Sequence, residues 1–286
     1  MDSRIAAVRR TERYGLRVAD FGVDTAVSGG DGRYSATLAE GWEIWGPQGG
    51  YVSTVALRAA AAQTTFPRPA SFACHFLRPA RSGAVDVRVD SLARSRRAES
   101  MRVTLVQNDA AILEALVWCV AELAGIDHHA PTRPEVPDPE DIQPWETYLP
   151  DGEPPFPFWR KVDVRWSSPG PTEWEQAREP RALVWERLRV RPPLEDPYVD
   201  AGRMLLLADS LMYPAATLAH DELFPYVAPS MDLAMSFHAA GADSDWLLID
   251  ADAPLSAGAL VSGRAAVWSK DGRLLASAMQ QMLQRT

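Results

Sequence analysis

The segment GGYVSTVALRAAAAQ, which runs from Gly49 to Gln63, is small and apolar on nearly every helical face. A helix with this pattern is surrounded by protein. Four strand-like segments follow it, separated by turn-prone residues such as RSG and ND. They are SFACHFL (71–77), AVDVRVDSL (84–92), ESMRVTLVQ (99–107) and AILEALVWCVA (111–121). The sequence therefore predicts one buried helix followed by an antiparallel meander.

The carboxyl-terminal part of the chain repeats this order. RALVWERLRV (181–190) alternates as a strand, and RMLLLADSLMYPAATLA (203–219) has the composition of an apolar helix. Four more strand-like segments complete a second meander: SMDLAMSFH (230–238), WLLIDADA (246–253), ALVSGRAAVWS (259–269) and LLASAMQQMLQ (274–284). The same α+β unit is thus predicted twice.

The two halves also keep a common spacing. Phe76 and Phe237 lie 161 positions apart, and Ile112 and Leu274 lie 162 apart. A period this long indicates duplication of a whole supersecondary unit. Two unrelated α+β halves in chance register are the alternative.

A segment rich in Pro, Asp and Glu separates the halves at residues 126–161. Neither a helix nor a central strand can persist through such a composition. We therefore divide the chain into a first unit at 1–125, this linker, and a second unit at 162–286. Five aromatic residues give the linker apolar anchors on the surface below it: Trp145, Tyr148, Phe156, Phe158 and Trp159.

Composition excludes several classes of protein. The 286 residues are 47% hydrophobic and 23% charged, as in ordinary folded globular proteins. Asp and Glu number 38 against 29 Lys and Arg, a net charge of −9, which argues against nucleic acid as a partner. The amino terminus (1–21) is charged every few residues, and no segment is long and apolar enough for a signal peptide or membrane span.

Cysteine, histidine and glycine patterns exclude further chemistry. Cys74 and Cys119 lie in apolar runs outside any CxxC motif, which indicates a reducing, cytoplasmic compartment. The five histidines show no HxxxH or HExxH spacing, so no metal site is expected. GxSxG, GxGxxG and P-loop motifs are absent from the sequence, which argues against serine hydrolases and nucleotide-driven enzymes.

Three motifs carry a family resemblance: ADSLMYPAATLA, PSMDLAMSFH and KDGRLLASAMQQ. Together with the repeated unit, they resemble the type II acyl-CoA thioesterases over nearly the whole chain. The resemblance implies a double hotdog fold with one continuous sheet, an acyl-CoA substrate and no cofactor. In that family an Asp on the second-half helix, a Thr or Ser at the head of the next strand and a Gln on the last strand position the hydrolytic water. The matching residues are Asp209, Ser230 and Gln280, with Ser at the position that is usually Thr.

Each of these residues also has a plain structural explanation. Asp209 is a carboxylate in an apolar helix and needs partners, but it could cap a helix that starts at Ser210. Gln280 is the one polar residue on its strand face, and its buried amide could serve simply to hydrogen-bond a backbone group. Ser230 at a strand edge is also typical of a turn.

The duplication indicates a single site. The common spacing matches Asp209 with Gln48, Ser230 with Pro69 and Gln280 with Trp118. The three polar groups thus occur together only in the second half, and the first half would form the wall of the site. Asp209 would take a proton from a water that Ser230 and Gln280 also hold.

Substrate contacts are expected at two places in the first half. Gly49 and Gly50 could present free amides of a helix start to a developing oxyanion, and Tyr51 is grouped with them. Tight helix packing is the alternative role of these glycines. Arg97, with Arg96 and Arg102 nearby, could meet the phosphates of coenzyme A, or could belong to a solvated loop.

Two other functions stay open at this point. His238 and Asp232 lie on the same side of one predicted strand, as a hotdog dehydratase or enoyl hydratase would require. A non-catalytic acyl-binding protein is the second alternative. By analogy with other hotdog sheets, a homodimer or homotetramer is expected.

Overall fold

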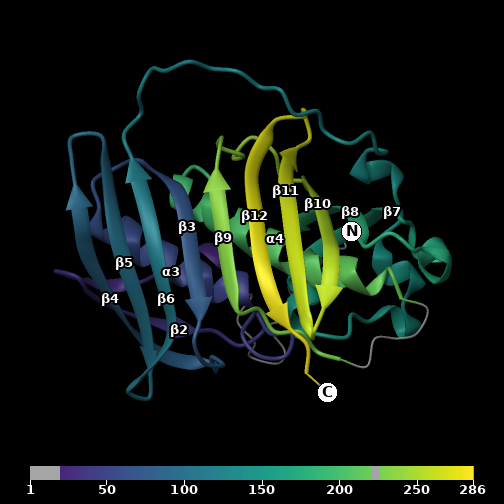
Figure 1. Cartoon of the computed structure of the whole chain (residues 1–286), viewed down its shortest axis with the longest axis horizontal. Helices are drawn as coiled ribbons and strands as arrows, with labels where there is room; N and C mark the ends of the chain where they lie inside the picture. The colour runs from purple at the N-terminus through teal and green to yellow at the C-terminus, as the bar shows by residue number, and fades with distance from the viewer. Residues whose placement is uncertain (1–19, 221–225, 286) are drawn as a thin grey trace, which may run out of the picture.

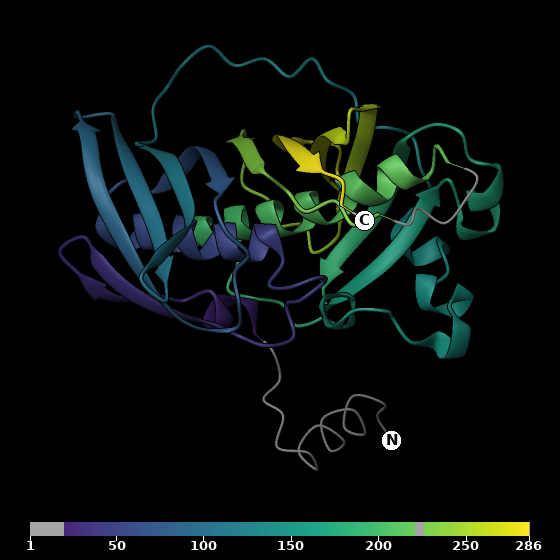
Figure 2. The same ribbon diagram turned by 60° about the horizontal axis from the view of Figure 1, so that its bottom comes forward.

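The computed structural model describes residues 20–220 and 226–285. Most of the charged amino-terminal segment that argues against a signal peptide (1–19) lies outside the described residues. The described chain forms one twelve-stranded antiparallel sheet, and two long helices lie side by side on one of its faces (Figures 1 and 2). The predicted α+β architecture with a continuous sheet is therefore confirmed.

The order of strands shows how the two halves join. It is β1-β2-β4-β5-β6-β3-β9-β12-β11-β10-β8-β7. The first half contributes β1 (Ser28–Gly30), β2 (Arg33–Leu38), β3 (Arg68–Phe76), β4 (Gly83–Arg94), β5 (Ala98–Gln107) and β6 (Ala110–Val120). The second contributes β7 (Val162–Ser168), β8 (Arg181–Leu188), β9 (Asp232–Phe237), β10 (Leu247–Ala257), β11 (Leu260–Ser269) and β12 (Leu274–Leu283). All the predicted strands are present, but only β4-β5-β6 and β10-β11-β12 run as meanders, because β3 pairs with β6 and β9 pairs with β12. The strands β1, β2 and β7 were not expected.

The halves meet at β3 and β9 about a local twofold axis. Ala73 pairs with Ala234 in this antiparallel ladder. These two alanines are 161 positions apart, the spacing of Phe76 and Phe237, so each faces its own counterpart. The register is what a duplicated unit would produce.

Helix α3 (Gly49–Gln63) has the predicted bounds, but α4 (Pro197–Thr217) begins six residues before the predicted start at residue 203. The earlier start has a local cause. The side chain of Asp196 accepts a hydrogen bond from Tyr198 N–H, and Pro197 occupies the first helical position. Asp209 consequently lies well inside α4, so its alternative role as a helix cap is wrong.

Two glycines let the helices approach each other closely. A Cβ atom on Gly50 would lie 2.4 Å from the carbonyl oxygen of Leu205, and one on Gly202 would lie 2.3 Å from the Thr54 side chain. Only glycine fits such contacts. This packing places the amino terminus of α3 against the middle of α4.

The linker has no strand or α-helix in the described structure, as its composition predicts. It crosses above the sheet (Figure 1) and then forms short 3-10 turns between Pro139 and Lys161. Trp145, Phe158 and Trp159 are buried in the core, whereas Tyr148 is exposed. The described helices include none with the length and apolar character needed to cross a membrane.

Candidate active site

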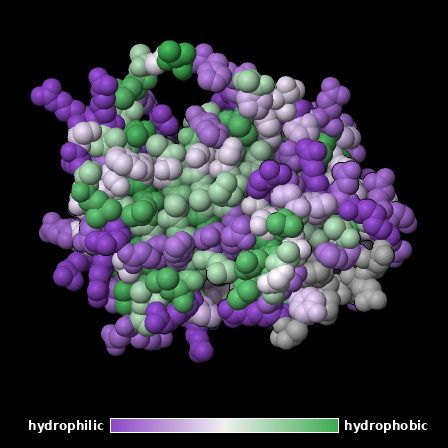
Figure 3. Space-filling view, viewed as in Figure 1, coloured by the Kyte–Doolittle hydropathy of each residue, from purple (hydrophilic) through white to green (hydrophobic). Residues whose placement is uncertain are grey.

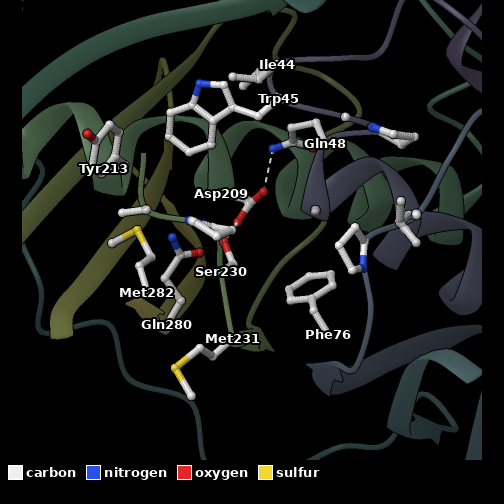
Figure 4. A pocket seen from close by; sticks show the side chains of 18 of the residues that line it. Ile44, Trp45, Gln48, Phe76, Asp209, Tyr213, Ser230, Met231, Gln280 and Met282 are labelled. Carbon is white, nitrogen blue, oxygen red and sulfur yellow. Dashed lines mark hydrogen bonds between the residues drawn. The ribbon is translucent and has the colours of Figure 1, made fainter. Parts of the chain in front are cut away.

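A pocket of about 460 Å³ opens where the two halves meet. Its walls come from the loop before α3, the later turns of α4, the segment just before β9 and the end of β12 (Figure 4). Most of the lining is apolar, and it includes Ile44, Val52, Phe76, Ile112, Trp159 and Met282. Such a lining suits the acyl part of a ligand.

Asp209, Ser230 and Gln280 all line this pocket. Ser230 Oγ donates a hydrogen bond to Asp209 Oδ1 at 3.2 Å. Gln280 is 3% exposed, and its Oε1 has no hydrogen-bond partner among the described residues. Its side chain points toward Ser230 and Asp209 (Figure 4). A buried amide oxygen without a partner is costly, so this group is suited to a bound water or ligand.

Gln48, a residue that sequence reasoning did not assign to the site, holds the other oxygen of Asp209. Gln48 Nε2 donates to Asp209 Oδ2 at 2.6 Å and to Leu206 O at 3.1 Å. Gln48 Oε1 accepts from Tyr51 N–H at 2.8 Å and thereby caps α3. The amide group is thus fixed at both ends, and it fixes the carboxylate in turn.

Burial raises the pKa of Asp209 to about 6. The hydrogen bonds from Gly50 N–H and Ser230 stabilise the charged carboxylate and oppose that shift. A carboxylate with such a pKa is still mostly ionised at neutral pH, yet it binds a proton more readily than an ordinary aspartate.

The structure separates the roles of the two glycines at the start of α3. Gly50 N–H donates to Asp209 Oδ2 at 2.9 Å, so this amide is already used. Gly49 lines the pocket, and its N–H has no acceptor among the described residues. A Cβ atom on Gly49 would lie 2.9 Å from Asp209 Oδ2. Of the two, Gly49 has the amide that can face a ligand.

Tyr51 is not a pocket residue, contrary to the sequence-based expectation. It is fully buried, its ring stacks on Trp42, and its hydroxyl donates to Asp24 O and accepts from Ala39 N–H. Each helical residue turns about 100° from the one before it, so the side chain at this position faces the core of the first half.

Arg97 is also remote from the pocket. It lies exposed in the turn between β4 and β5, at the end of the sheet where β3 begins. The pocket lies where β3 ends at Phe76, eight residues further along and therefore about 26 Å away. The predicted contact between Arg97 and the carrier phosphates is wrong for a ligand in this pocket.

Strand pairing revises one of the predicted counterparts. Gln280 pairs with Gly263, and the matching pair in the first half is Val117 with Met101. The counterpart of Gln280 is therefore Val117, not Trp118, because the spacing differs slightly from strand to strand. Trp118 lies on the exposed face of the sheet.

Gln48 is the partner of Asp209 and not its counterpart. Gln48 caps the start of α3, whereas Asp209 lies well inside α4.

A second acidic group lies beneath the site. Glu186 on β8 is completely buried, and burial raises its pKa well above the ordinary value. Its carboxyl group lies 3.2 Å from Ser210 Oγ, which itself donates to Leu207 O at 2.7 Å. A protonated Glu186 can donate to Ser210, so a neutral acid supports the turn of α4 that carries Asp209.

The residues of the alternative hydratase lie elsewhere. His238 and Asp232 do share one face of β9, as predicted. That face is the outer one, where His238 is exposed and contacts Ser277 Oγ. None of the described residues that line the pocket is a histidine. Within residues 20–220 and 226–285 no three side chains of His, Cys, Asp or Glu gather as metal ligands.

Comparison with known proteins agrees with this geometry. Residues 38–120 match the acyl-CoA thioesterase N-terminal domain, and residues 133–284 match the acyl-CoA thioesterase C-terminal domain. No curated protein matches the chain.

Several solved structures share the fold. A hotdog protein of unknown function from Alicyclobacillus acidocaldarius superposes with a TM-score of 0.82 at 19% identity, covering 94% of this chain and 99% of its own. A thioesterase II described as putative from Thermobifida fusca gives 0.78 at 22%, covering 95% and 99%. An acyl-CoA thioesterase II from Mycobacterium marinum gives 0.75 at 22%, covering 93% and 98%. The double hotdog fold is thereby confirmed, and by its two domain matches the chain belongs to the acyl-CoA thioesterase family.

Proposed function

We propose that this protein hydrolyses acyl-CoA thioesters to a free carboxylic acid and coenzyme A by direct attack of water. The observation that carries the proposal is the convergence of Asp209, Ser230 and Gln280 on one apolar pocket. Gln280 has an unpartnered amide oxygen there, and the Asp209 carboxyl group has a raised pKa. Membership of the thioesterase family supports the same reaction.

Asp209 acts as the general base through Oδ1. Its other oxygen, Oδ2, already accepts two hydrogen bonds, from Gln48 Nε2 and Gly50 N–H. Oδ1 accepts only the longer bond from Ser230 among the described residues. A water beside Ser230, with its two hydrogens accepted by Oδ1 and by Gln280 Oε1, therefore gives one proton to Oδ1 as its oxygen attacks the thioester carbonyl.

The attack forms a tetrahedral intermediate whose negative oxygen needs a donor. The free N–H of Gly49, at the positive end of α3, supplies that donor. Collapse of the intermediate breaks the carbon–sulfur bond, and the thiolate leaves with the proton held on Asp209. No group of the protein becomes covalently modified in this sequence.

A thiol-release assay with short, medium, long, branched and aromatic acyl-CoAs tests the proposal. We expect wild-type turnover on at least one substrate, and losses of about 10² or more for Asp209→Asn and Gln280→Ala, the scale of losing a positioned base or water ligand. Asp86→Asn, the same change at an exposed position of β4, is the matched control. A wild type that binds acyl-CoA without releasing thiol would identify a non-catalytic acyl-binding protein instead.

We further propose that the enzyme works in the cytoplasm as a homodimer or homotetramer. The buried free thiols of Cys74 and Cys119 suit a reducing compartment. The outer face of the sheet carries the exposed apolar residues Leu116, Trp118 and Met279. Figure 3 shows hydrophobic side chains over the middle of this face. Light scattering of wild type and of Trp118→Glu tests the assembly.

A further inference from the structure

Two arginines lie at the rim of the pocket, one from each half of the chain. Arg78 follows β3 and Arg285 follows β12, and both are exposed pocket-lining residues. Sequence reasoning selected neither of them. The only acidic residue among the described lining residues is Asp209. The lining therefore has an excess of positive charge, in a chain whose net charge is −9.

Neither of these arginines has a carboxylate partner among the described residues. In contrast, Arg181, Arg264 and Arg273 each form an ion pair with an aspartate. An unpaired guanidinium at the mouth of a pocket has its hydrogen-bond donors available for an anion.

The backbone around each arginine is fixed while most of its donors are free. Arg78 uses one N–H to donate to Ala111 O at 2.7 Å, which leaves the rest of its five donors. Arg285 exchanges two backbone hydrogen bonds with Val227, at 3.1 and 2.8 Å. Those bonds hold the main chain and do not involve the guanidinium.

We propose that Arg78 and Arg285 bind the phosphate groups of the thiol carrier and so select phosphorylated pantetheine thioesters. This inference rests on the proposed function. The acyl group then lies among the apolar side chains of the pocket with its carbonyl at Asp209, and the carrier leaves through the rim between the arginines. Two halves of the protein thus hold one anion, just as they jointly hold Asp209.

The shared chemistry is a phosphate ester on a pantetheine arm, which has two sources. Coenzyme A carries a diphosphate and a ribose phosphate, whereas an acyl carrier protein presents a single phosphodiester. Because arginine recognises phosphate by charge-assisted hydrogen bonds, the richer anion is expected to bind better. Acyl-CoA, acyl-dephospho-CoA and an acyl carrier protein with the same acyl group distinguish the sources.

The test compares each of these substrates with the matching acyl-pantetheine, which carries no phosphate. For acyl-CoA we expect Arg78→Ala and Arg285→Ala each to raise KM by about tenfold with little change in kcat. For acyl-pantetheine both variants should behave as wild type, which also shows that they fold. Arg97→Ala, an exposed arginine at the other end of the sheet, is the matched control and should change neither substrate.

Two further measurements test whether the charge of the arginine is responsible. Arg78→Lys keeps the charge and should retain part of the affinity, and added salt should raise KM for acyl-CoA but not for acyl-pantetheine. Equal KM values for acyl-CoA and acyl-pantetheine in wild type, or an unchanged KM in both alanine variants, would overturn the inference while leaving hydrolysis intact. Absence of thiol release from every thioester would instead contradict the proposed function.

Discussion

Gln48 Nε2 donates to Asp209 Oδ2 at 2.6 Å, so a side chain of the first half holds the carboxylate carried by the second. The partner on each side is rigid. Gln48 is anchored by its cap bond to Tyr51 N–H, and Asp209 lies on a helix packed against α3 without a gap. The orientation of the proposed base thus depends on both halves.

Replacing Gln48 should separate orientation from charge. Gln48→Ala removes the donor to Oδ2, and we expect kcat to fall about tenfold with KM unchanged, because a misoriented base loses positioning and not binding. Loss of the cap should also cost about 1 kcal/mol of stability. Gln48→Glu keeps an acceptor for Tyr51 N–H but places a carboxylate beside Asp209, so the pH midpoint of activity should rise. An unshifted pH profile in that variant would contradict the contact.

Activity should follow the ionisation of Asp209. The active form is the carboxylate, and its pKa is about 6. The rate should therefore be low in acid, rise around pH 6 and level off above neutrality, with about a tenfold loss one pH unit below the midpoint. A pH profile of kcat/KM for acyl-CoA measures this. A midpoint near 4, the value of an exposed aspartate, would mean that Asp209 is not the base.

Ser230 should be replaceable by the residue that shares its hydroxyl. Ser230→Thr keeps the donor to Asp209 Oδ1, so turnover should be nearly unchanged. Ser230→Ala removes a hydrogen bond that lowers the pKa of Asp209, and the pH midpoint should move upward. Parallel pH profiles of the two variants give the comparison. If threonine proves as harmful as alanine, the hydroxyl is not what matters here.

Alanine substitutions at the adjacent residues Gly49 and Gly50 should differ in their effects on activity and stability. A Cβ on Gly49 meets Asp209 Oδ2, so Gly49→Ala should displace the carboxylate and abolish most activity at modest cost in stability. A Cβ on Gly50 meets the backbone of α4 at Leu205, so Gly50→Ala should force the helices apart and cost about 1–3 kcal/mol. Thermal melts beside thiol-release assays separate the two effects, and equal melting losses would contradict the distinction.

The buried acid Glu186 should make the protein less stable as pH rises. Its folded-state pKa is raised above its ordinary value of 4.5, so the unfolded chain loses this proton at a lower pH than the folded one does. The stabilisation from the bound proton is complete below the ordinary pKa of 4.5, and it is lost as the pH rises through the folded-state pKa. Glu186→Gln is neutral at every pH, so its advantage in Tm over wild type should grow as the pH rises above 4.5.

The exposed residue Glu122 supplies the control for that experiment. Glu122→Gln makes the same change at an exposed position and is measured beside it. Glu186→Ala should melt lower than wild type at acid pH, because it loses both volume and the contact to Ser210. A constant difference between wild type and Glu186→Gln would show that Glu186 is not neutral in the folded protein.

Local patterns were sufficient to predict the main architecture. Both long helices are apolar on most faces, and strands such as β5, β9 and β11 alternate between buried and less buried residues. Strand β1 escaped prediction because its three residues are all exposed, whereas β2 and β7 do alternate between buried and less buried residues and were overlooked. Asp209, Ser230 and Gln280 were selected because their motifs resemble those of the type II acyl-CoA thioesterases, and the apolar surroundings of Asp209 and Gln280 supported the choice.

Contacts between the halves could not be predicted from those patterns. The bond from Gln48 to Asp209 depends on which turn of α4 lies against the start of α3, and this follows from helix packing at Gly50 and Gly202. The predictions for Tyr51 and Arg97 were wrong for related reasons. The nearness of Tyr51 to Gly49 in sequence did not show which helical face it occupies. The basic composition of the loop around Arg97 did not show at which end of the sheet that loop lies. A register error of one residue likewise exchanged Val117 for Trp118.

The join between β3 and β9 has a consequence for how the site is maintained. One half supplies Gln48, Gly49 and Gly50, and the other supplies Asp209, Ser230 and Gln280. If the halves were separate polypeptides, they would have to associate before the site could form. Within one polypeptide the partner is always present at high effective concentration. Dilution therefore cannot separate the two sets of residues. One half can supply the hydrogen-bond donors and the other the carboxylate, and neither half has to supply both.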